Sequence, residues 1–204
     1  MRRRFGKVIN KIAKKDKKII LLVGDIGYSI FDDFRKEHPK RFFNLGICEQ
    51  SLIGVASGLA LEGFKPWVYT ITPFLIERPF EQIKLDIDQQ NVNVKLIGFA
   101  DYPHLGPTHS EINAKKLMSL FKNIRSYFPK NGNETEKFIY QSYKRNGPNF
   151  ISLKNDPIIQ KRPTVIIINT IKGKGIKEFE NDPVWHARKL AGNEIKIGKK
   201  RLGL

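Results

Sequence analysis

The chain of 204 residues is 40% hydrophobic and 11% aromatic, which supplies a core and excludes a wholly disordered protein. Its net charge of +17 is uneven, with +8 in residues 1–18, +7 in residues 161–204 and +2 between, so solvated basic ends are expected rather than a nucleic-acid groove. The single cysteine, Cys48, excludes a disulfide framework and favours a cytoplasmic location, and the longest apolar run, Ile19–Val23, is far below the ~20 residues that cross a membrane.

Hydrophobic periodicity predicts strands that alternate with helices. The apolar residues of the basic start recur at helical spacing and predict an amphipathic helix; they are Phe5, Val8, Ile9 and Ile12. Short continuous apolar runs are typical of buried parallel strands, and they lie at Ile19–Val23, Trp67–Ile71, Val92–Phe99, Asn149–Leu153 and Thr164–Ile168.

The segments between these runs predict helices. Gln50–Leu61 is apolar on nearly every side, so it is expected to be buried, and Leu75–Ile87 is expected to form the next helix. Two further helix starts are predicted by capping boxes, in which a polar residue is followed three positions later by glutamate: Thr108 with Glu111, and Asn133 with Glu136, the latter helix stopping at Gly147. The alternation predicts a parallel α/β sheet flanked by helices.

Phosphate-binding and metal-binding patterns are largely missing. Neither common glycine-rich phosphate motif occurs, although Lys172–Gly175 could line a phosphate or form a mobile turn. His104 and His109 have no cysteine or further histidine close by, so no metal site is expected in this chain.

Polar residues placed where the predicted strands end are the candidates for function, because ligands bind at the carboxyl ends of strands in open α/β sheets. Asp25 follows the first strand. Glu49 enters the apolar helix, where it is either a helix-capping residue or a buried functional acid. His109 follows the Val92–Phe99 strand across a Gly/Pro loop, as a cap-region residue or a catalytic one.

Several motifs occur in an order that resembles the pyrimidine-binding domain of transketolases and, similarly, of deoxyxylulose-phosphate synthase. Over roughly residues 5–155 they read GDIGYS, FFNLGICEQSLIGVASGLALEGFKPWVYT, PFLIERPFEQIK, NVNVKLIG and GPTHSE. The resemblance implies the corresponding α/β fold and thiamine diphosphate as cofactor. It also implies that Glu49 hydrogen-bonds the aminopyrimidine ring and thereby favours its imino tautomer.

The same resemblance assigns roles to other residues. Phe74 matches the aromatic residue that stacks on the pyrimidine, and Ile71 a neighbouring wall position. His109 matches a histidine that contacts the donor sugar, and Asp25 an acid near the cofactor and the subunit interface. Two more positions match the motifs with either a structural or a catalytic role; they are Arg78 and Gln82.

The C-terminal part resembles a different domain. Asn155–Pro163, with two prolines, is the expected linker between a domain at residues 1–157 and a tail at residues 158–204. KRPTVIIINTIKGKGIKEFENDPVWHARKL resembles the end of the family's diphosphate-binding domain. There His186 matches a substrate-contacting histidine, although Ala187 replaces the glycine that follows it.

Departures from the family pattern shape the expected function. The G-D-G…N element for magnesium and diphosphate is missing, as is the third transketolase domain, and Leu105 replaces an aspartate that contacts the donor sugar. The resemblance therefore implies one subunit of a split, oligomeric transketolase-like enzyme, which transfers a two-carbon ketol unit between sugars or sugar phosphates. A separate diphosphate-binding subunit would supply the Mg²⁺ site.

Three alternatives remain open from the sequence. The chain could be a catalytically inactive remnant or assembly module, because its order is rearranged and elements are missing. It could belong to another thiamine diphosphate enzyme such as deoxyxylulose-phosphate synthase, which Leu105 favours. Nucleic-acid binding through the basic ends is less expected and predicts a steeply salt-dependent affinity. No membrane partner is expected.

Overall fold

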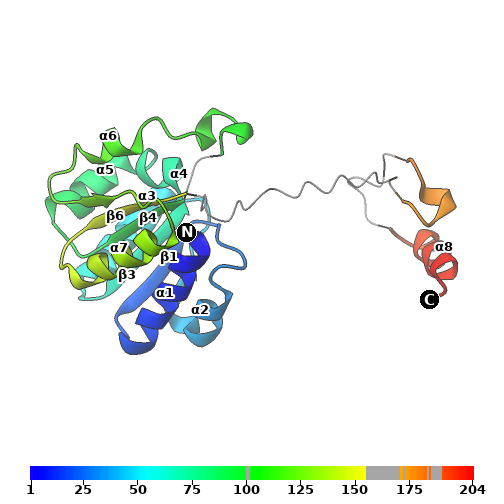
Figure 1. Ribbon diagram of the computed structural model, residues 1–204, viewed down its shortest axis with the longest axis horizontal. Coiled ribbons are helices and arrows are strands. Elements are labelled where there is room, and N and C mark those ends of the chain that lie inside the picture. Colours follow the sequence, from blue (N-terminus) through cyan, green and yellow to red (C-terminus); the bar gives the residue numbers. More distant parts are fainter. Residues whose placement is uncertain (100–101, 155–170, 172, 183, 185–189) are drawn as a thin grey trace. The chain divides into compact units, whose positions relative to one another are not determined.

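The computed structural model describes residues 1–99, 102–154, 171, 173–182, 184 and 190–204 (Figure 1). Chain contacts divide the protein into two compact units, Met1–Gln160 and Lys161–Leu204. Three features named above lie outside the described residues: the predicted strand at Thr164–Ile168, the linker at Asn155–Pro163, and His186. None of the helices in the described ranges is long and apolar enough to cross a membrane.

The first unit contains a parallel sheet, which in the described residues has six strands in the order β2-β1-β3-β4-β6-β5 (Figure 1). The strands are β1 (Ile19–Val23), β2 (Phe42–Asn44), β3 (Lys65–Ile71), β4 (Lys95–Phe99), β5 (Arg125–Tyr127) and β6 (Asn149–Leu153). The predicted parallel α/β class is confirmed. The two outermost strands were not predicted, because each has three residues and no continuous apolar run.

Alternating residues of the strands supply two separate cores. Ile19 and Leu21 of β1 face the core beneath α1 (Arg2–Lys15) and α7 (Gly132–Lys144), which lie side by side (Figure 1). Ile20 and Leu22 face the opposite core, with residues of α3 (Glu49–Leu61). The four apolar residues predicted for the first helix are all buried in the α1 core, so that helix is confirmed.

The helix α3 corrects one prediction. Its inner residues Leu52, Ile53 and Ala56 are fully buried, but Gly54 and Val55 on the other face are exposed in this chain. The prediction that this helix is buried is therefore correct for one face only, and its own domain leaves the other face exposed.

The predicted helix at Leu75–Ile87 is broken. It consists of α4 (Thr72–Ile76), α5 (Phe80–Gln82) and a π-helical segment at Ile83–Gln89. The break falls at Pro79, which lacks a backbone N–H and cannot continue the helix from the residues before it.

Both predicted capping boxes are wrong. Thr108 lies in a 3-10 turn at Pro107–His109, and the next helix, α6 (Ala114–Met118), is capped by Asn113, whose side chain accepts from the Lys116 N–H at 2.9 Å. The helix α7 begins at Gly132, because the Asn131 side chain accepts from the N–H groups of residues 133 and 134 at 3.0 Å. It ends at Lys144 rather than at Gly147.

The remaining elements are short or lie in the second unit. They are α2 (Asp32–Glu37), 3-10 turns at Pro39–Arg41, Pro103–Leu105 and Lys177–Phe179, and α8 (Asn193–Leu202). In the second unit, Arg201 of α8 pairs with Glu178. Residues 173–175 form a turn in which the Gly175 N–H donates to Glu180 at 3.1 Å, which favours the turn interpretation of this segment.

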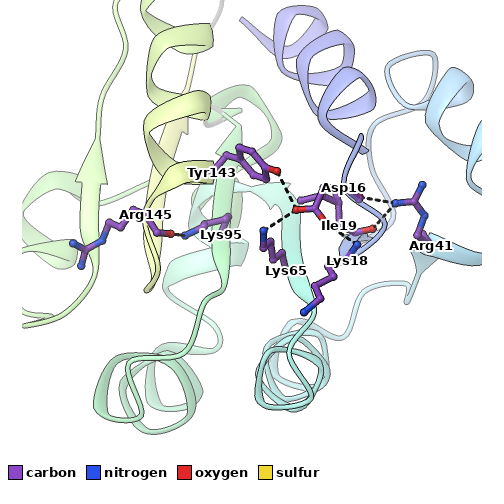
Figure 2. Close-up of polar contacts among 8 residues, drawn as sticks. All are labelled: Asp16, Lys18, Ile19, Arg41, Lys65, Lys95, Tyr143 and Arg145. Carbon is purple, nitrogen blue, oxygen red and sulfur yellow. Dashed lines mark hydrogen bonds and ion pairs between the residues drawn. The ribbon is translucent and has the colours of Figure 1, made fainter. Parts of the chain in front are cut away.

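Polar side chains fasten the amino ends of the strands (Figure 2). The Asp16 carboxylate accepts from Lys65 Nζ at 2.7 Å and the Tyr143 hydroxyl at 3.0 Å, which ties α1 to β3 and α7. Burial raises the pKa of Asp16, but hydrogen bonds from Lys65, Lys18 and Tyr143 outweigh it and hold this pKa below its ordinary value. Arg41 donates to the Asp16 carbonyl at 3.0 Å just before β2. The polar side chains at the amino edge of the sheet therefore stabilise the fold. A binding site is expected at the opposite, carboxyl edge.

Candidate functional site

Four side chains meet at the carboxyl edge of the sheet, contributed by the segments that follow β2, β3 and β4. They are Glu49, Phe74, Arg78 and His109. The chain passes from β1 to β2 on one side and then returns to β3 on the other, so the strand order switches between β1 and β3. Open α/β sheets bind ligands outside the carboxyl ends of the strands at such a switch point.

Glu49 is a buried carboxylate at the start of a helix. It is the first residue of α3, directly after Cys48, and only 3% of its surface is exposed. Arg78 Nη1 donates to both carboxylate oxygens, at 3.0 Å to Oε1 and 3.1 Å to Oε2. The positive end of the α3 dipole also favours the negative charge. The predicted candidate acid thus lies buried in an ion pair that the sequence interpretation did not foresee.

Phe74 places an aromatic ring beside this ion pair. The ring belongs to α4, which follows β3, and the residue is 9% exposed. The Arg78 guanidinium carbon lies 3.6 Å from the ring centroid, as in a cation–π contact. The His109 ring approaches Phe74 edge-on, with centroids 4.8 Å apart and planes at 66°. His109 Nδ1 lies 3.1 Å from the Thr108 hydroxyl oxygen.

Asp25 lies at the end of β1 in a separate hydrogen-bonded group. Its backbone φ is +51°, an uncommon conformation for a residue other than glycine. Its N–H donates to Asn44 Oδ1 at 3.0 Å, and Asn44 Nδ2 donates back to its carboxylate at 3.1 Å. The Tyr28 hydroxyl donates to the same carboxylate oxygen at 3.3 Å. Sequence reasoning missed Asn44, because it ends β2, a strand that was not predicted.

The other predicted residues lie nearby or outside the described ranges. Ile71 is the half-buried last residue of β3, immediately before α4. Gln82 is half-buried at the end of α5, and Leu105 is 56% exposed in the loop after β4. The structure does not describe His186.

The chemistry of these residues fits one half of the expected cofactor. A buried carboxyl group can bond a ring nitrogen of an aminopyrimidine, and an adjacent phenyl ring can stack on the heterocycle. Across the described ranges, no group of three or more His, Cys, Asp or Glu residues is placed to hold a metal ion. The described residues therefore fit the aminopyrimidine, whereas they present no such acidic or histidine cluster for a metal-bound diphosphate.

Comparison with known proteins identifies similar sequences and folds. Residues 1–156 match the family described as "Transketolase, pyrimidine binding domain". An apulose-4-phosphate transketolase subunit of Actinobacillus succinogenes is 42% identical over 123 residues, covering 59% of this chain and 40% of that protein. The 1-deoxy-D-xylulose-5-phosphate synthase of Halalkalibacterium halodurans is 32% identical over 151 residues, covering 70% of this chain and 23% of that protein.

A solved structure shows the same fold. It is described as a split gene transketolase in an inactive beta4 tetramer, and it superposes with a TM-score of 0.68 at 31% identity, covering 75% of this chain and 50% of that chain. The present chain thus spans half or less of the length of these relatives.

Proposed function

The chain belongs to the transketolase family, whose pyrimidine-binding domain it carries over residues 1–156, and on this premise we propose that it is one subunit of a split thiamine diphosphate-dependent enzyme. The assembled cytoplasmic enzyme transfers a two-carbon ketol unit between sugar phosphates. In this proposal, residues 1–157 form the pyrimidine-binding domain and residues 158–204 an appended tail. A separate subunit binds the diphosphate and Mg²⁺. The buried Glu49 carboxylate beside Phe74 at the strand-order switch carries the proposal.

Each residue of the site has a part in this reaction. Thiamine diphosphate, when bound, supplies the carbon nucleophile for ketol transfer. Glu49 holds a proton between its carboxyl oxygen and the pyrimidine ring nitrogen, and its burial excludes water from that bond. Phe74 orients the ring, with Ile71 as a neighbouring wall. His109, whose ring contacts Phe74, binds oxygen atoms of the donor sugar.

Two further residues act at the margin of the site. Asp25, held by Asn44, lies towards the partner subunit. For His186 of the tail, we propose contact with substrate in the assembled enzyme, on the resemblance of its segment alone.

The names of two relatives support a partner subunit. One is named as a subunit of a transketolase, and the other is a split gene transketolase whose beta chains form a tetramer described as inactive. By analogy, we expect this chain to need a second polypeptide for turnover.

The exposed face of α3 is the surface proposed to bind that partner. Gly54, Val55 and Leu61 of this helix are exposed, and Ile47 just before it is 71% exposed. Apart from the adjoining residues and the backbone of the helix itself, no atom lies within 4 Å of a Cβ built on Gly54 or Gly58, so a partner can approach this backbone closely. A helix that is apolar all round is normally buried, and a partner chain would bury the face of α3 that the first unit leaves exposed.

Replacing Gly54 by glutamine tests this surface. Because the position is open and helical, the change is expected to leave the free energy of unfolding equal or raise it by about 0.5–1 kcal/mol. The added side chain is expected to weaken assembly with the partner at least about tenfold, by preventing close packing. Denaturant unfolding and sedimentation of the complex measure the two effects. Lys137→Gln, at an exposed position of α7, is the control, and unchanged assembly of the Gly54 variant would place the partner elsewhere.

Purification of the full chain from its native source, with the proteins that bind it, tests the function. The complex is expected to contain a diphosphate-binding subunit and to transfer a ketol unit from a ketose phosphate to an aldose phosphate when given thiamine diphosphate and Mg²⁺. The chain alone is expected to show no turnover. A complex without turnover would favour the remnant or assembly module.

A second candidate reaction has specific support. The similarity to 1-deoxy-D-xylulose-5-phosphate synthase covers 70% of this chain, and Leu105 replaces the sugar-contacting aspartate of many transketolases. The same complex is therefore assayed with pyruvate and glyceraldehyde 3-phosphate. Turnover with pyruvate in place of the ketose phosphate as donor would assign the second reaction.

A further inference from the structure

Arg78 occupies both of the surfaces that the proposed function gives to the aminopyrimidine. One of its nitrogens bonds both oxygens of Glu49, at 3.0 and 3.1 Å. Its guanidinium carbon lies 3.6 Å from the centroid of the Phe74 ring. The same side chain therefore satisfies the carboxylate and covers the aromatic face.

A stacked heterocycle and this guanidinium cannot share one face of Phe74. A stacked ring would lie over the face of Phe74 that the Arg78 guanidinium carbon now covers, 3.6 Å from the ring centroid. Phe74 is only 9% exposed, and the His109 ring lies against it edge-on, so little free surface is left for a second stacking partner. Stacking on Phe74 therefore requires Arg78 to move.

The bond to Glu49 leads to the same conclusion. A guanidinium cation stabilises the ionised carboxylate, whereas a bond from a protonated carboxyl group to a ring nitrogen needs the neutral form. Arg78 and the pyrimidine thus compete for Glu49 as well as for Phe74.

Arg78 is placed so that it can leave. It lies between α4 and α5, next to Pro79, where the helix is interrupted. The Arg78 side chain is 35% exposed, against 4% for that of Glu49, so the guanidinium has a route to solvent. A buried carboxylate without a partner is strongly unfavourable, which explains why a substitute cation is useful when no ligand is bound.

We propose that Arg78 is a displaceable placeholder, which holds Glu49 and Phe74 in the ligand-free chain and swings out when an aminopyrimidine ring binds. The proposal rests on the proposed function, since it concerns the same site. It makes Arg78 a positioning residue whose removal strengthens ligand binding, in contrast to a residue that supports the bound ring.

Binding of 4-amino-2-methylpyrimidine to the full chain, followed by NMR titration, tests the placeholder. Arg78→Met, which removes the cation and keeps an unbranched side chain, is expected to bind this probe about tenfold more tightly than the wild type. Arg78→Lys, which keeps the charge but loses the planar group, is expected to fall between them. In the wild type, the side-chain NMR signal of Arg78 is expected to shift towards that of a solvent-exposed arginine when the probe is added.

If Arg78→Met does not fold because Glu49 loses its partner, a second pair of variants applies. The double variant Glu49→Gln/Arg78→Met leaves no unpaired buried charge and is compared with Glu49→Gln alone. The double variant is expected to bind the probe more tightly, because the Phe74 face is free.

Failure of the placeholder differs from failure of the function. If Glu49→Gln weakens binding but Arg78→Met binds equally or more weakly than the wild type, the aminopyrimidine site is supported and the placeholder is wrong. If the probe does not bind the wild type, or if Glu49→Gln changes nothing, the aminopyrimidine site itself is wrong, and the placeholder with it.

Discussion

Replacing Glu49 by glutamine is expected to lower the kcat of the assembled enzyme about 10³-fold, which is within the usual range for losing a general acid–base group. Glutamine keeps the size of the side chain and a hydrogen-bond donor, but it cannot exchange a proton with the ring nitrogen. The buried position of Glu49 excludes water that could replace it in this role. The measurement is steady-state turnover of the purified complex at saturating thiamine diphosphate and Mg²⁺.

The control for this variant is Glu62→Gln, at the other end of α3. Glu62 is exposed and follows the last residue of the helix, so its loss is expected to leave kcat within about twofold. Both variants should assemble with the partner as the wild type does. A Glu49→Gln complex with wild-type kcat would show that the proton is held elsewhere and would remove the central residue of the proposed site.

Local patterns identified the interior of this fold well. The runs Ile19–Val23 and Asn149–Leu153 are strands with the predicted bounds. Strands buried on both faces of a sheet are mostly apolar, although Asn149 and Ser152 of the second run are buried polar residues. The four-residue apolar pattern of α1 is reproduced in its core contacts for the same reason. Helix starts were predicted less well. The helices are capped by Asn113 and Asn131, not by the predicted Thr108 and Asn133. Each loop contains several polar residues that could cap a helix, so the sequence alone did not select the right one.

The sequence indicated which residues were candidates for the site, but not how their side chains are arranged. Glu49 and Phe74 were marked by motif position, and both lie at the carboxyl edge. The pairing of Glu49 with Arg78 spans 29 residues and depends on how α3 and α4 pack around β3, which no local pattern encodes. The sequence alone therefore did not decide between a structural and a catalytic role for Arg78. The placeholder proposal comes from the contacts that Arg78 makes in the structure.

Replacing Lys95 by methionine is expected to lower the free energy of unfolding by about 3 kcal/mol at pH 7. Lys95 is 1% exposed at the start of β4. Its Nζ donates to the carbonyl oxygens of Arg145 at 3.0 Å and Gly147 at 2.6 Å, and to Asn149 Oδ1 at 2.8 Å (Figure 2 shows the Arg145 bond). Methionine fills a similar volume but leaves these acceptors without their donor, and unsatisfied buried acceptors are unfavourable. Urea unfolding of the two chains measures the difference.

The pH dependence separates this explanation from a simple packing defect. Burial, with smaller contributions from Arg145 and Lys65, lowers the pKa of Lys95 to about 7, against its ordinary value of 10.5. Between these values the unfolded chain binds more protons at Lys95 than the folded chain, so the wild type gains stability as pH rises from 7 to 10. The slope from this residue is at most about 1.4 kcal/mol per pH unit. The Lys95→Met variant lacks this pH-dependent gain. The difference in the free energy of unfolding between the wild type and the variant is therefore expected to grow as pH rises.

The control is Lys144→Met, at an exposed position of α7, which is expected to change stability by less than about 0.5 kcal/mol at any pH in this range. If the loss of unfolding free energy in Lys95→Met stays constant from pH 7 to 10, that loss comes from packing alone and not from the titrating amine. Because Lys95 lies at the amino ends of the strands and Glu49 at the carboxyl side, the folded Lys95 variant should still bind the aminopyrimidine probe with wild-type affinity. Loss of binding in the folded variant would mean that the two edges of the sheet are coupled.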